Sequence, residues 1–236
     1  MTPQRRYRRG MARDRRTTTV LALVALLLGG VTGCSDDAVD AEEATPQSLA
    51  AAALAHYDEP LAAVAPIFGD ERLRRGDLAV ELAFDRPEGD NTHVRVVVSD
   101  RLPYGRDDED PCAGPWKCQD VGTDEVAGTL LYEAGYPEED PGVVLAWSER
   151  GDEVVWAYAY GPFIAPDDEG GPDEEASALG DALAAIVTDP AVGRRTSEAY
   201  AEAGQELCGG GDWLEWYGQG NGSPRPEDFR DWCAED

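Results

Sequence analysis

The alternation of apolar and polar residues predicts strands in the middle of the chain. In residues 77–85 and 92–99 every second residue is apolar, a period of two that is typical of half-buried strands. Residues 86–91 between them contain proline, glycine, aspartate and asparagine, which favour a turn, so the two segments are expected to form an antiparallel pair. The polar face of this pair is predicted to carry Asp77, Glu81, Asp85, His93, Arg95 and Ser99.

Three more strands are expected after this pair. Residues 126–132 form one of them, and the clearest hairpin joins residues 143–147 to residues 154–160. Gly151 and Asp152 lie at its tip, where a glycine in the first position suits a type II′ turn. The sheet should therefore have about five strands.

Helices are expected before the strands. Thr45 followed by Pro46 is typical of an N-cap and a first helical position, so an alanine-rich helix is predicted from there to about Tyr57. A second short helix is expected to begin near Pro60.

Two further helices are expected after the strands. Residues 176–187 carry one apolar stripe, which Pro190 ends. Thr196 is expected to cap the next helix, with Tyr200 and Leu207 on its buried face. The order of helices, strands and helices indicates an α+β fold, in which an antiparallel sheet of about five strands has the N- and C-terminal helices packed on it.

The beginning of the chain has the pattern of an export signal. Seven arginines and one aspartate lie in the first nineteen residues, and an apolar run over residues 20–31 follows. This run is shorter than the ~20 residues that a membrane-spanning helix needs, so a secretory signal peptide over residues 1–33 is the better interpretation. Residues 34–46 are acidic and lack bulky side chains, which predicts a flexible tether before a single domain over residues 47–236.

The end of the signal is more specific. Val31-Thr32-Gly33-Cys34 resembles a bacterial lipobox, in which an aliphatic residue and two small residues precede an obligatory cysteine. The resemblance implies lipidation of the Cys34 sulfur with a diacylglycerol and cleavage that leaves Cys34 as the first mature residue. It also implies a lipid anchor on the extracytoplasmic face of the cell membrane, because acyl chains hold a protein there. The alternative is an ordinary thiol beside a conventional cleavage site.

Charge limits the classes of partner. The chain has 20 basic and 48 acidic residues; without residues 1–33 it keeps 13 and 47, and its net charge is −34. Such a surface repels phosphate backbones, so nucleic acid is excluded as a partner. Solubility is the simplest explanation of the charge, and cationic ligands, divalent metals or a basic protein surface stay open.

Four cysteines remain after Cys34, and in an exported domain this even number predicts two disulfides. Three pairings are open. The local one, Cys112–Cys118 with Cys208–Cys233, is favoured because it joins the cysteines that are nearest in the sequence. It would close a turn in the irregular residues 102–123 and tie down the C-terminal segment 208–236. The rival is a zinc site, although the spacing of the first two cysteines exceeds that of a usual ligand pair.

The sequence holds few candidates for catalysis. The two histidines, His56 and His93, belong to no recognisable nucleophile elbow, metalloprotease motif or catalytic triad. The acidic residues 107–110 and 167–169 have the oxygen ligands that calcium prefers, but neither run has the spacing of a calcium-binding loop. No catalytic residue, metal ligand or cofactor is therefore predicted.

Aromatic residues near the C-terminus are the candidate ligand-binding residues. The rings of Trp213, Trp216 and Tyr217 could stack on sugars, or could instead pack against the predicted Cys208–Cys233 bridge. The leading interpretation of the whole chain is a membrane-anchored envelope lipoprotein that acts as a non-catalytic binding or interaction module for an envelope protein or glycan. The alternative is an envelope hydrolase acting on cell-wall glycan or peptide.

Overall fold

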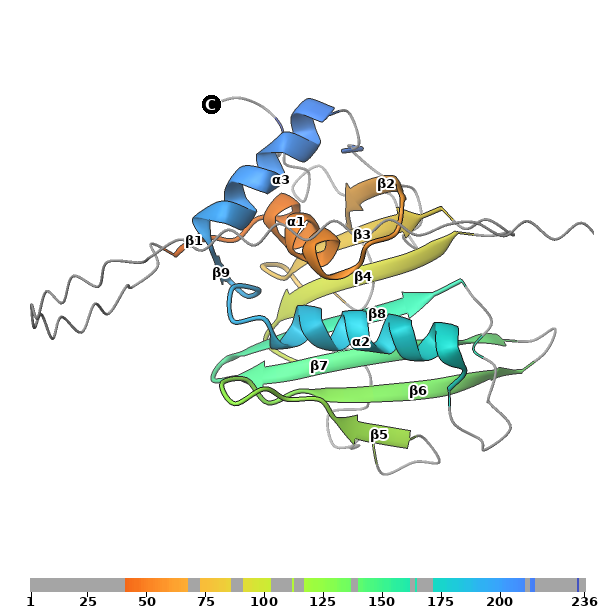
Figure 1. The fold of residues 1–236 in the computed structure, drawn as a ribbon. Coiled ribbons are helices and arrows are strands. Elements are labelled where there is room, and N and C mark those ends of the chain that lie inside the picture. Colours follow the sequence, from red (N-terminus) through yellow and green to blue (C-terminus); the bar gives the residue numbers. More distant parts are fainter. Residues whose placement is uncertain are drawn as a thin grey trace, which may run out of the picture. The chain divides into compact units, whose positions relative to one another are not determined.

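The protein has an α+β fold with one large antiparallel sheet (Figure 1). The computed structural model describes residues 41–67, 73–85, 91–102, 112, 117–136, 140–161, 164, 172–210, 213–214 and 233. The large sheet has the order β2-β3-β4-β8-β7-β6-β5 and is antiparallel throughout. Its strands are β2 (Leu61–Pro66), β3 (Leu78–Phe84), β4 (Thr92–Ser99), β5 (Lys117–Asp120), β6 (Thr129–Tyr136), β7 (Asp140–Arg150) and β8 (Glu153–Tyr160).

Three helices and a small second sheet complete the described fold. The helices are α1 (Pro46–His56), α2 (Glu174–Thr188) and α3 (Glu198–Gly210). The small sheet pairs β1 (Glu42–Glu43) with β9 (Arg195–Thr196) in antiparallel fashion. The first strand of this sheet lies inside the range that the sequence predicted as a tether, so the domain includes residues before its first helix.

The large sheet has seven strands, and the expectation of about five was wrong. The helix expected near Pro60 is also wrong, because residues 61–66 form β2 at one edge of the sheet. Four backbone positions from Ala63 to Pro66 pair directly with β3, and this cross-strand pairing overrides the helix preference of the three alanines in the segment. At the other edge, β5 lies within the segment expected to be irregular, because it pairs with β6.

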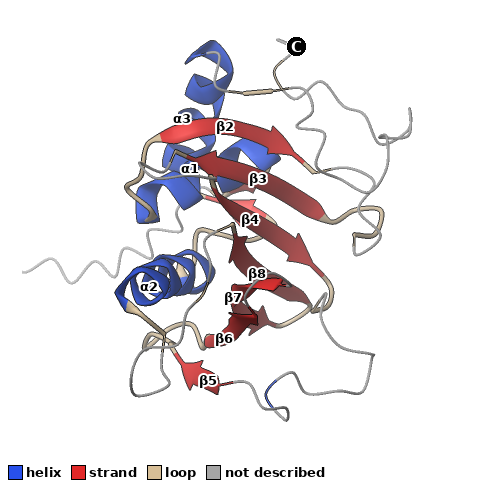
Figure 2. Cartoon of the chain, turned by 90° about the vertical axis from the view of Figure 1, so that its right-hand side faces the viewer, coloured by secondary structure: helices blue, strands red, loops and turns tan. Residues whose placement is uncertain are grey.

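Helices α1 and α2 cover one face of the sheet, and α3 packs on α1 as a further layer (Figure 2). Every second residue of the strands points into this core, as the period-two pattern predicted. At about 25 cal/mol per Å² of buried apolar area, this core is the main stabilising contribution to the fold. Its strand residues include Val80, Leu82, Phe84, Val94, Val96, Val98, Val144, Ala146, Val155, Ala157 and Ala159.

The helix ends follow the sequence signals with one exception. Thr45 caps α1 through a reciprocal capping box with Ser48, and α2 ends just before Pro190. The cap expected at Thr196 was wrong, because the side chain of Ser197 accepts the hydrogen bond from the backbone nitrogen of Tyr200 at 3.2 Å. Thr196 instead belongs to β9, so the helix begins one residue later than its sequence indicated.

The second face of the sheet is also buried, which the half-buried pattern did not predict. Glu81 is only 3% exposed and Arg95 only 6%, although both lie on the face expected to be polar. A second apolar cluster shares this face and comprises Ala79, Val97, Leu131, Leu145, Trp147, Val154, Trp156 and Tyr158. The central strands are therefore enclosed on both sides.

Candidate functional site

Five polar and aromatic side chains gather on the sheet face opposite the helices. The register places Glu81 of β3 opposite Arg95 of β4, and Arg95 opposite Tyr158 of β8. Two residues before Arg95, on the same face of the sheet, His93 of β4 lies opposite Tyr160 of β8. Strands far apart in sequence thus bring these five residues together, and we call them the sheet-face cluster.

The Glu81 carboxylate is the centre of the sheet-face cluster. Its Oε2 atom accepts a hydrogen bond from Nε of Arg95 at 2.5 Å. Its Oε1 atom lies 3.0 Å from Nδ1 of His93 and accepts a hydrogen bond from the Tyr160 hydroxyl at 2.8 Å. A buried carboxylate is stable only when charged or polar groups compensate its lost hydration, and these three contacts do so.

Arg95 connects the carboxylate to both tyrosines. Its Nη1 donates to the Tyr158 hydroxyl at 2.6 Å and its Nη2 to the Tyr160 hydroxyl at 3.3 Å. The guanidinium carbon also lies over both rings, 5.5 Å and 5.3 Å from their centroids. This combination of hydrogen bonds and cation–π contacts fixes the planar guanidinium group in one orientation.

The environment of the sheet-face cluster shifts the pKa values of Glu81, Arg95 and Tyr160. Burial by itself would raise the pKa of the Glu81 carboxyl, but the hydrogen bond from His93, the charge of Arg95 and the hydrogen bond from Tyr160 together outweigh it. The pKa of Glu81 therefore lies below its ordinary value, and the group stays charged at neutral pH. Burial, and after it the negative charge of Glu81, raises the pKa of the Tyr160 hydroxyl, which stays protonated.

The rim of the sheet-face cluster is an aromatic pair. The rings of His93 and Tyr160 are stacked, with centroids 4.9 Å apart and planes 12° from parallel. The His93 side chain is 16% exposed, against 3% for Glu81. The pair therefore lies at the more accessible side of the sheet-face cluster. The contacts of His93 and Tyr160 with Glu81 hold the two rings in place.

A second titratable cluster joins the three helices. Nε2 of His56, at the end of α1, lies 2.9 Å from Oδ2 of Asp189, the C-cap residue of α2. The hydroxyl of Tyr200 in α3 donates to the same Oδ2 at 2.7 Å. Burial would raise the pKa of Asp189, but the hydrogen bonds from His56, Tyr200 and the Ala191 backbone lower it overall. Asp189 thus holds three helix ends together.

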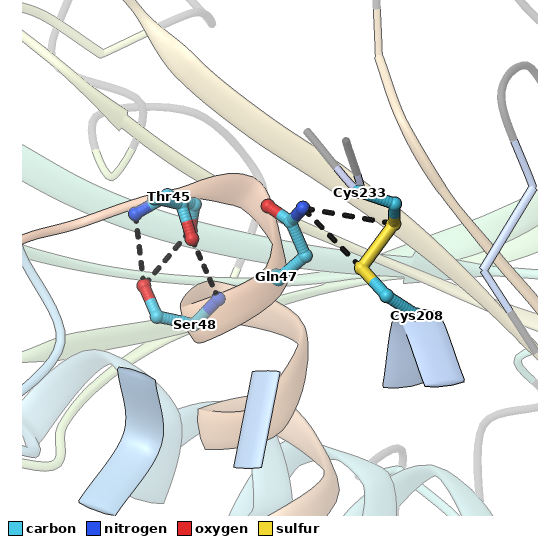
Figure 3. The surroundings of a disulfide bond; sticks show 5 residues. All are labelled: Thr45, Gln47, Ser48, Cys208 and Cys233. Carbon is cyan, nitrogen blue, oxygen red and sulfur yellow. Dashed lines mark hydrogen bonds between the residues drawn. A yellow bond between two sulfur atoms is a disulfide. The ribbon is translucent and has the colours of Figure 1, made fainter. Parts of the chain in front are cut away.

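Both disulfides with the local pairing are present. Cys112–Cys118 closes a short loop beside the second apolar cluster, and Cys208–Cys233 joins the end of α3 to the C-terminal segment. The side-chain nitrogen of Gln47 in α1 contacts both sulfurs of the second bridge, at 3.7 Å and 3.9 Å (Figure 3). This bridge therefore attaches the C-terminal segment at a point where α1 and α3 meet.

Of the aromatic residues proposed as a ligand platform, Trp213 lies in the described part of the structure. It is half-buried, packs against the helix-side core and forms a parallel bridge with Val64 of β2. The Leu214 backbone nitrogen donates to the Val64 carbonyl at 2.9 Å, so this short segment lies along the free edge of β2. Trp216 and Tyr217 lie outside the described residues, as do Cys34 and the acidic residues 107–110 and 167–169.

Two general classes of site are not seen in the described residues. No group of three or more histidine, cysteine, aspartate or glutamate side chains within them is arranged to hold a metal ion. No helix among those same residues is both long and apolar enough to cross a membrane.

Sequence reasoning placed the members of the sheet-face cluster on strand faces but did not bring them together. Glu81, His93 and Arg95 share a predicted face because they alternate with valine, leucine and alanine. The tyrosines reach them only because β8, the last strand of the large sheet in chain order, inserts beside β4. The register of the first hairpin indicates that Glu81 and Arg95 lie directly opposite each other. It does not indicate that the two side chains are buried.

No protein-family model matches the chain, no curated protein sequence is significantly similar to it, and no solved structure is significantly similar to it.

Proposed function

We propose that this protein is a lipoprotein of the bacterial cell envelope. Acyl chains on Cys34 hold it to the extracytoplasmic face of the cell membrane, and its α+β domain acts as a non-catalytic binding or interaction module. The partner is a protein or a glycan of the envelope.

The proposed anchor is supported by the N-terminal sequence. The arginine-rich start, the short apolar run and Val31-Thr32-Gly33-Cys34 occur in the order of an export signal with a lipobox. The seven residues between Cys34 and the start of β1 at Glu42 provide a short connection from the anchor to the domain. Lipidation at Cys34 would therefore leave the domain close to the bilayer.

One observation carries the non-catalytic part of the proposal: both histidines are bound to a carboxylate in a closed structural network. His93 contacts Glu81 and stacks on Tyr160, while His56 contacts Asp189 at the junction of three helices. General acid–base catalysis needs a group within reach of a substrate proton, and Nδ1 of His93 and Nε2 of His56 are each already engaged by a carboxylate of the domain. Such networks favour a rigid surface for recognition.

The anchor is tested by metabolic labelling with an alkyne analogue of palmitate and by membrane fractionation. The wild type is expected to carry label on the Cys34 peptide and to sediment with membranes. Cys34→Ser is expected to lose the label and to leave the membrane fraction or accumulate as precursor. Equal membrane retention of both proteins would contradict the anchor.

The module is tested by adding defined cell-wall glycan fragments and stem peptides to the purified protein. A binding module is expected to raise its melting temperature with a ligand that mass spectrometry recovers unchanged after long incubation. Cleavage of the fragment that disappears in both His93→Gln and His56→Gln would support the hydrolase instead. A response to neither class of fragment would remove glycan and stem peptide from the proposal and leave an envelope protein as the partner.

A further inference from the structure

Aromatic side chains form a continuous row along one face of β8. Trp156, Tyr158 and Tyr160 alternate with alanine, so the period of two of the strand places all three on the sheet face opposite the helices. The ring centroids of Trp156 and Tyr158 are 5.7 Å apart, and those of Tyr158 and Tyr160 are 5.8 Å apart. Neighbouring planes lie 17° and 26° from parallel, so each ring is stacked on the next. We call these three residues the aromatic row.

The aromatic row leads from the interior to the accessible side of the sheet-face cluster. Trp156 is 2% exposed and Tyr158 is 4% exposed, whereas Tyr160 is half-buried. The His93 ring, which is itself partly exposed, stacks on Tyr160. Stacked π-systems therefore connect a buried indole to a phenol at the rim.

Polar contacts fix each ring of the aromatic row. Nε1 of Trp156 donates to the Ser99 hydroxyl at 3.2 Å, and the Tyr158 hydroxyl accepts from Arg95 at 2.6 Å. The Tyr160 hydroxyl accepts a longer bond from the same arginine at 3.3 Å. Because these dipoles and charges are already in place, a change of charge on a ring requires little rearrangement around it. A small rearrangement favours electron transfer between neighbouring rings.

Tyr160 also has a proton acceptor in place. Loss of an electron turns a phenol into a strong acid, so the stable oxidised form is the neutral phenoxyl radical, which has lost the hydroxyl proton as well. Oε1 of Glu81 accepts the Tyr160 hydroxyl at 2.8 Å, and this carboxylate, whose pKa lies below its ordinary value, is charged at neutral pH. At Tyr158, by contrast, the shorter bond from the Arg95 cation makes the ring harder to oxidise. A missing electron is therefore more stable on Tyr160 than on Tyr158.

From this geometry we propose that the aromatic row is an electron-transfer path that carries an oxidising equivalent from Trp156 to Tyr160. A one-electron oxidant removes an electron from the Trp156 ring, which keeps its N–H proton. An electron then passes from Tyr160 by way of Tyr158 to the oxidised indole, while the Tyr160 proton moves to Oε1 of Glu81. Trp156 is restored, Tyr160 becomes a neutral radical and Glu81 a neutral acid.

A small thiolate in solution closes the cycle at the rim. It gives one electron to the Tyr160 radical and becomes a thiyl radical, while Glu81 returns the proton to the phenol oxygen. The path protects the buried core, because an oxidised indole that persists is converted irreversibly to hydroxylated products. This activity goes beyond the proposed binding module and depends neither on the anchor nor on the partner.

The electron path is tested with an ultraviolet laser flash on the purified protein. Such a flash ionises tryptophans whether or not they are exposed, and nitrous oxide with tert-butanol removes the released electrons and the radicals formed from them. Transient absorption is expected to show tryptophan radicals decaying as tyrosyl radicals grow, at a rate independent of protein concentration. Tyr160→Phe keeps the ring but removes the phenol, so the amplitude of this growth should fall.

A control and a double variant assign the growth to the aromatic row. Tyr136→Phe removes the same hydroxyl from an exposed position at the end of β6, and should leave the amplitude unchanged. Trp156→Phe should lower the amplitude as much as Tyr160→Phe does, and the double variant should lower it no further, because both residues belong to one path. Additive losses, or equal amplitudes in Tyr160→Phe and Tyr136→Phe, would overturn the path. The second comparison stands even if Trp156→Phe does not fold.

Infrared difference spectra after the flash test the proton step. A new carbonyl band of a protonated carboxyl group is expected with the tyrosyl radical in the wild type, and no such band in Tyr160→Phe. A wild-type tyrosyl radical without this band would overturn Glu81 as the proton acceptor.

Repeated flashes with glutathione present test the protection. Mass spectrometry of the peptide that contains Trp156 should find it intact in the wild type and in Tyr136→Phe. Hydroxylated Trp156 should accumulate in Tyr160→Phe, because the oxidised indole there has lost its electron donor. Equal damage in all three proteins would overturn the protective role.

Discussion

Nε of Arg95 lies 2.5 Å from Oε2 of Glu81 in the middle of the sheet, where the two side chains are only 7% and 3% exposed. The residues are direct neighbours across β3 and β4, and the two tyrosine hydroxyls and His93 complete the hydrogen bonds around them. Each ion compensates the lost hydration of the other. The pair is therefore a point at which one substitution leaves a buried charge without its counterion.

Replacing Glu81 should destabilise the protein strongly. Glu81→Gln keeps the shape of the side chain but removes the charge that balances Arg95, so we expect a loss of about 3–5 kcal/mol in the free energy of unfolding. Urea denaturation followed by tryptophan fluorescence measures this loss. Asp85→Asn is the control: Asp85 follows the same strand and is exposed, and a change within about 0.5 kcal/mol is expected there.

The double variant tests whether the two charges act as a pair. Glu81→Leu combined with Arg95→Met removes both ions together, so its loss should be smaller than the sum of the two single losses. Additive losses would show that each side chain stabilises the sheet independently of the other.

Acid should remove the contribution of Glu81. Its pKa is depressed in the folded protein, so its stabilising effect is complete above the ordinary value of 4.5 and is lost as the pH falls through the lower, folded value. The difference in unfolding free energy between wild type and Glu81→Gln should therefore shrink as the pH falls below 4.5. Protonation of the other acids also relieves charge repulsion at low pH. This effect is the same in both proteins, so it cancels in the difference. A difference that stays constant into strong acid would contradict the assignment.

Gly204 allows α3 to approach α1. A Cβ atom at this position would lie 2.7 Å from the backbone carbon of Gln47 and 2.8 Å from the backbone nitrogen of Ser48. Gly204→Ala should therefore cost about 1–3 kcal/mol through overpacking, although alanine is the better helix former. Thermal unfolding followed by circular dichroism shows whether the substitution raises or lowers the melting temperature.

Gly209 in the same helix is the matched control. A Cβ atom there would meet no atom within 4 Å, so Gly209→Ala should be neutral or should stabilise by up to about 1 kcal/mol. If both substitutions were stabilising, the close approach of α3 to α1 would be wrong.

The two disulfides should differ in their contributions. Their sequence separations are 6 for Cys112–Cys118 and 25 for Cys208–Cys233. Loop-closure entropy predicts losses of roughly 2 and roughly 3.5 kcal/mol when each pair is changed to serine, because the longer loop frees more conformations in the unfolded chain. Denaturation of the two paired-serine proteins measures both losses. A larger loss for the short loop would indicate that packing, and not chain entropy, sets the contribution.

The sequence by itself determined the elements whose signals are local. The N-cap at Thr45, the alternation in residues 78–84 and 92–99, and the hairpin around Gly151 are all found in the structure. Gly151 has φ of 65°, the left-handed conformation that a glycine in the tip was expected to supply. Each of these features depends on residues a few positions apart, so their physical cause is visible in a short stretch of sequence.

Only the tertiary structure decided what depends on distant neighbours. Residues 61–66 became an edge strand because β3 offered backbone hydrogen bonds to them, and β5 formed in the same way on β6. Likewise, the insertion of β8 between β4 and β7 placed Tyr158 and Tyr160 against Arg95. Alternation shows which residues share a face but does not show whether that face meets water or protein. The burial of Glu81 and Arg95 therefore follows from packing between segments that the sequence keeps far apart.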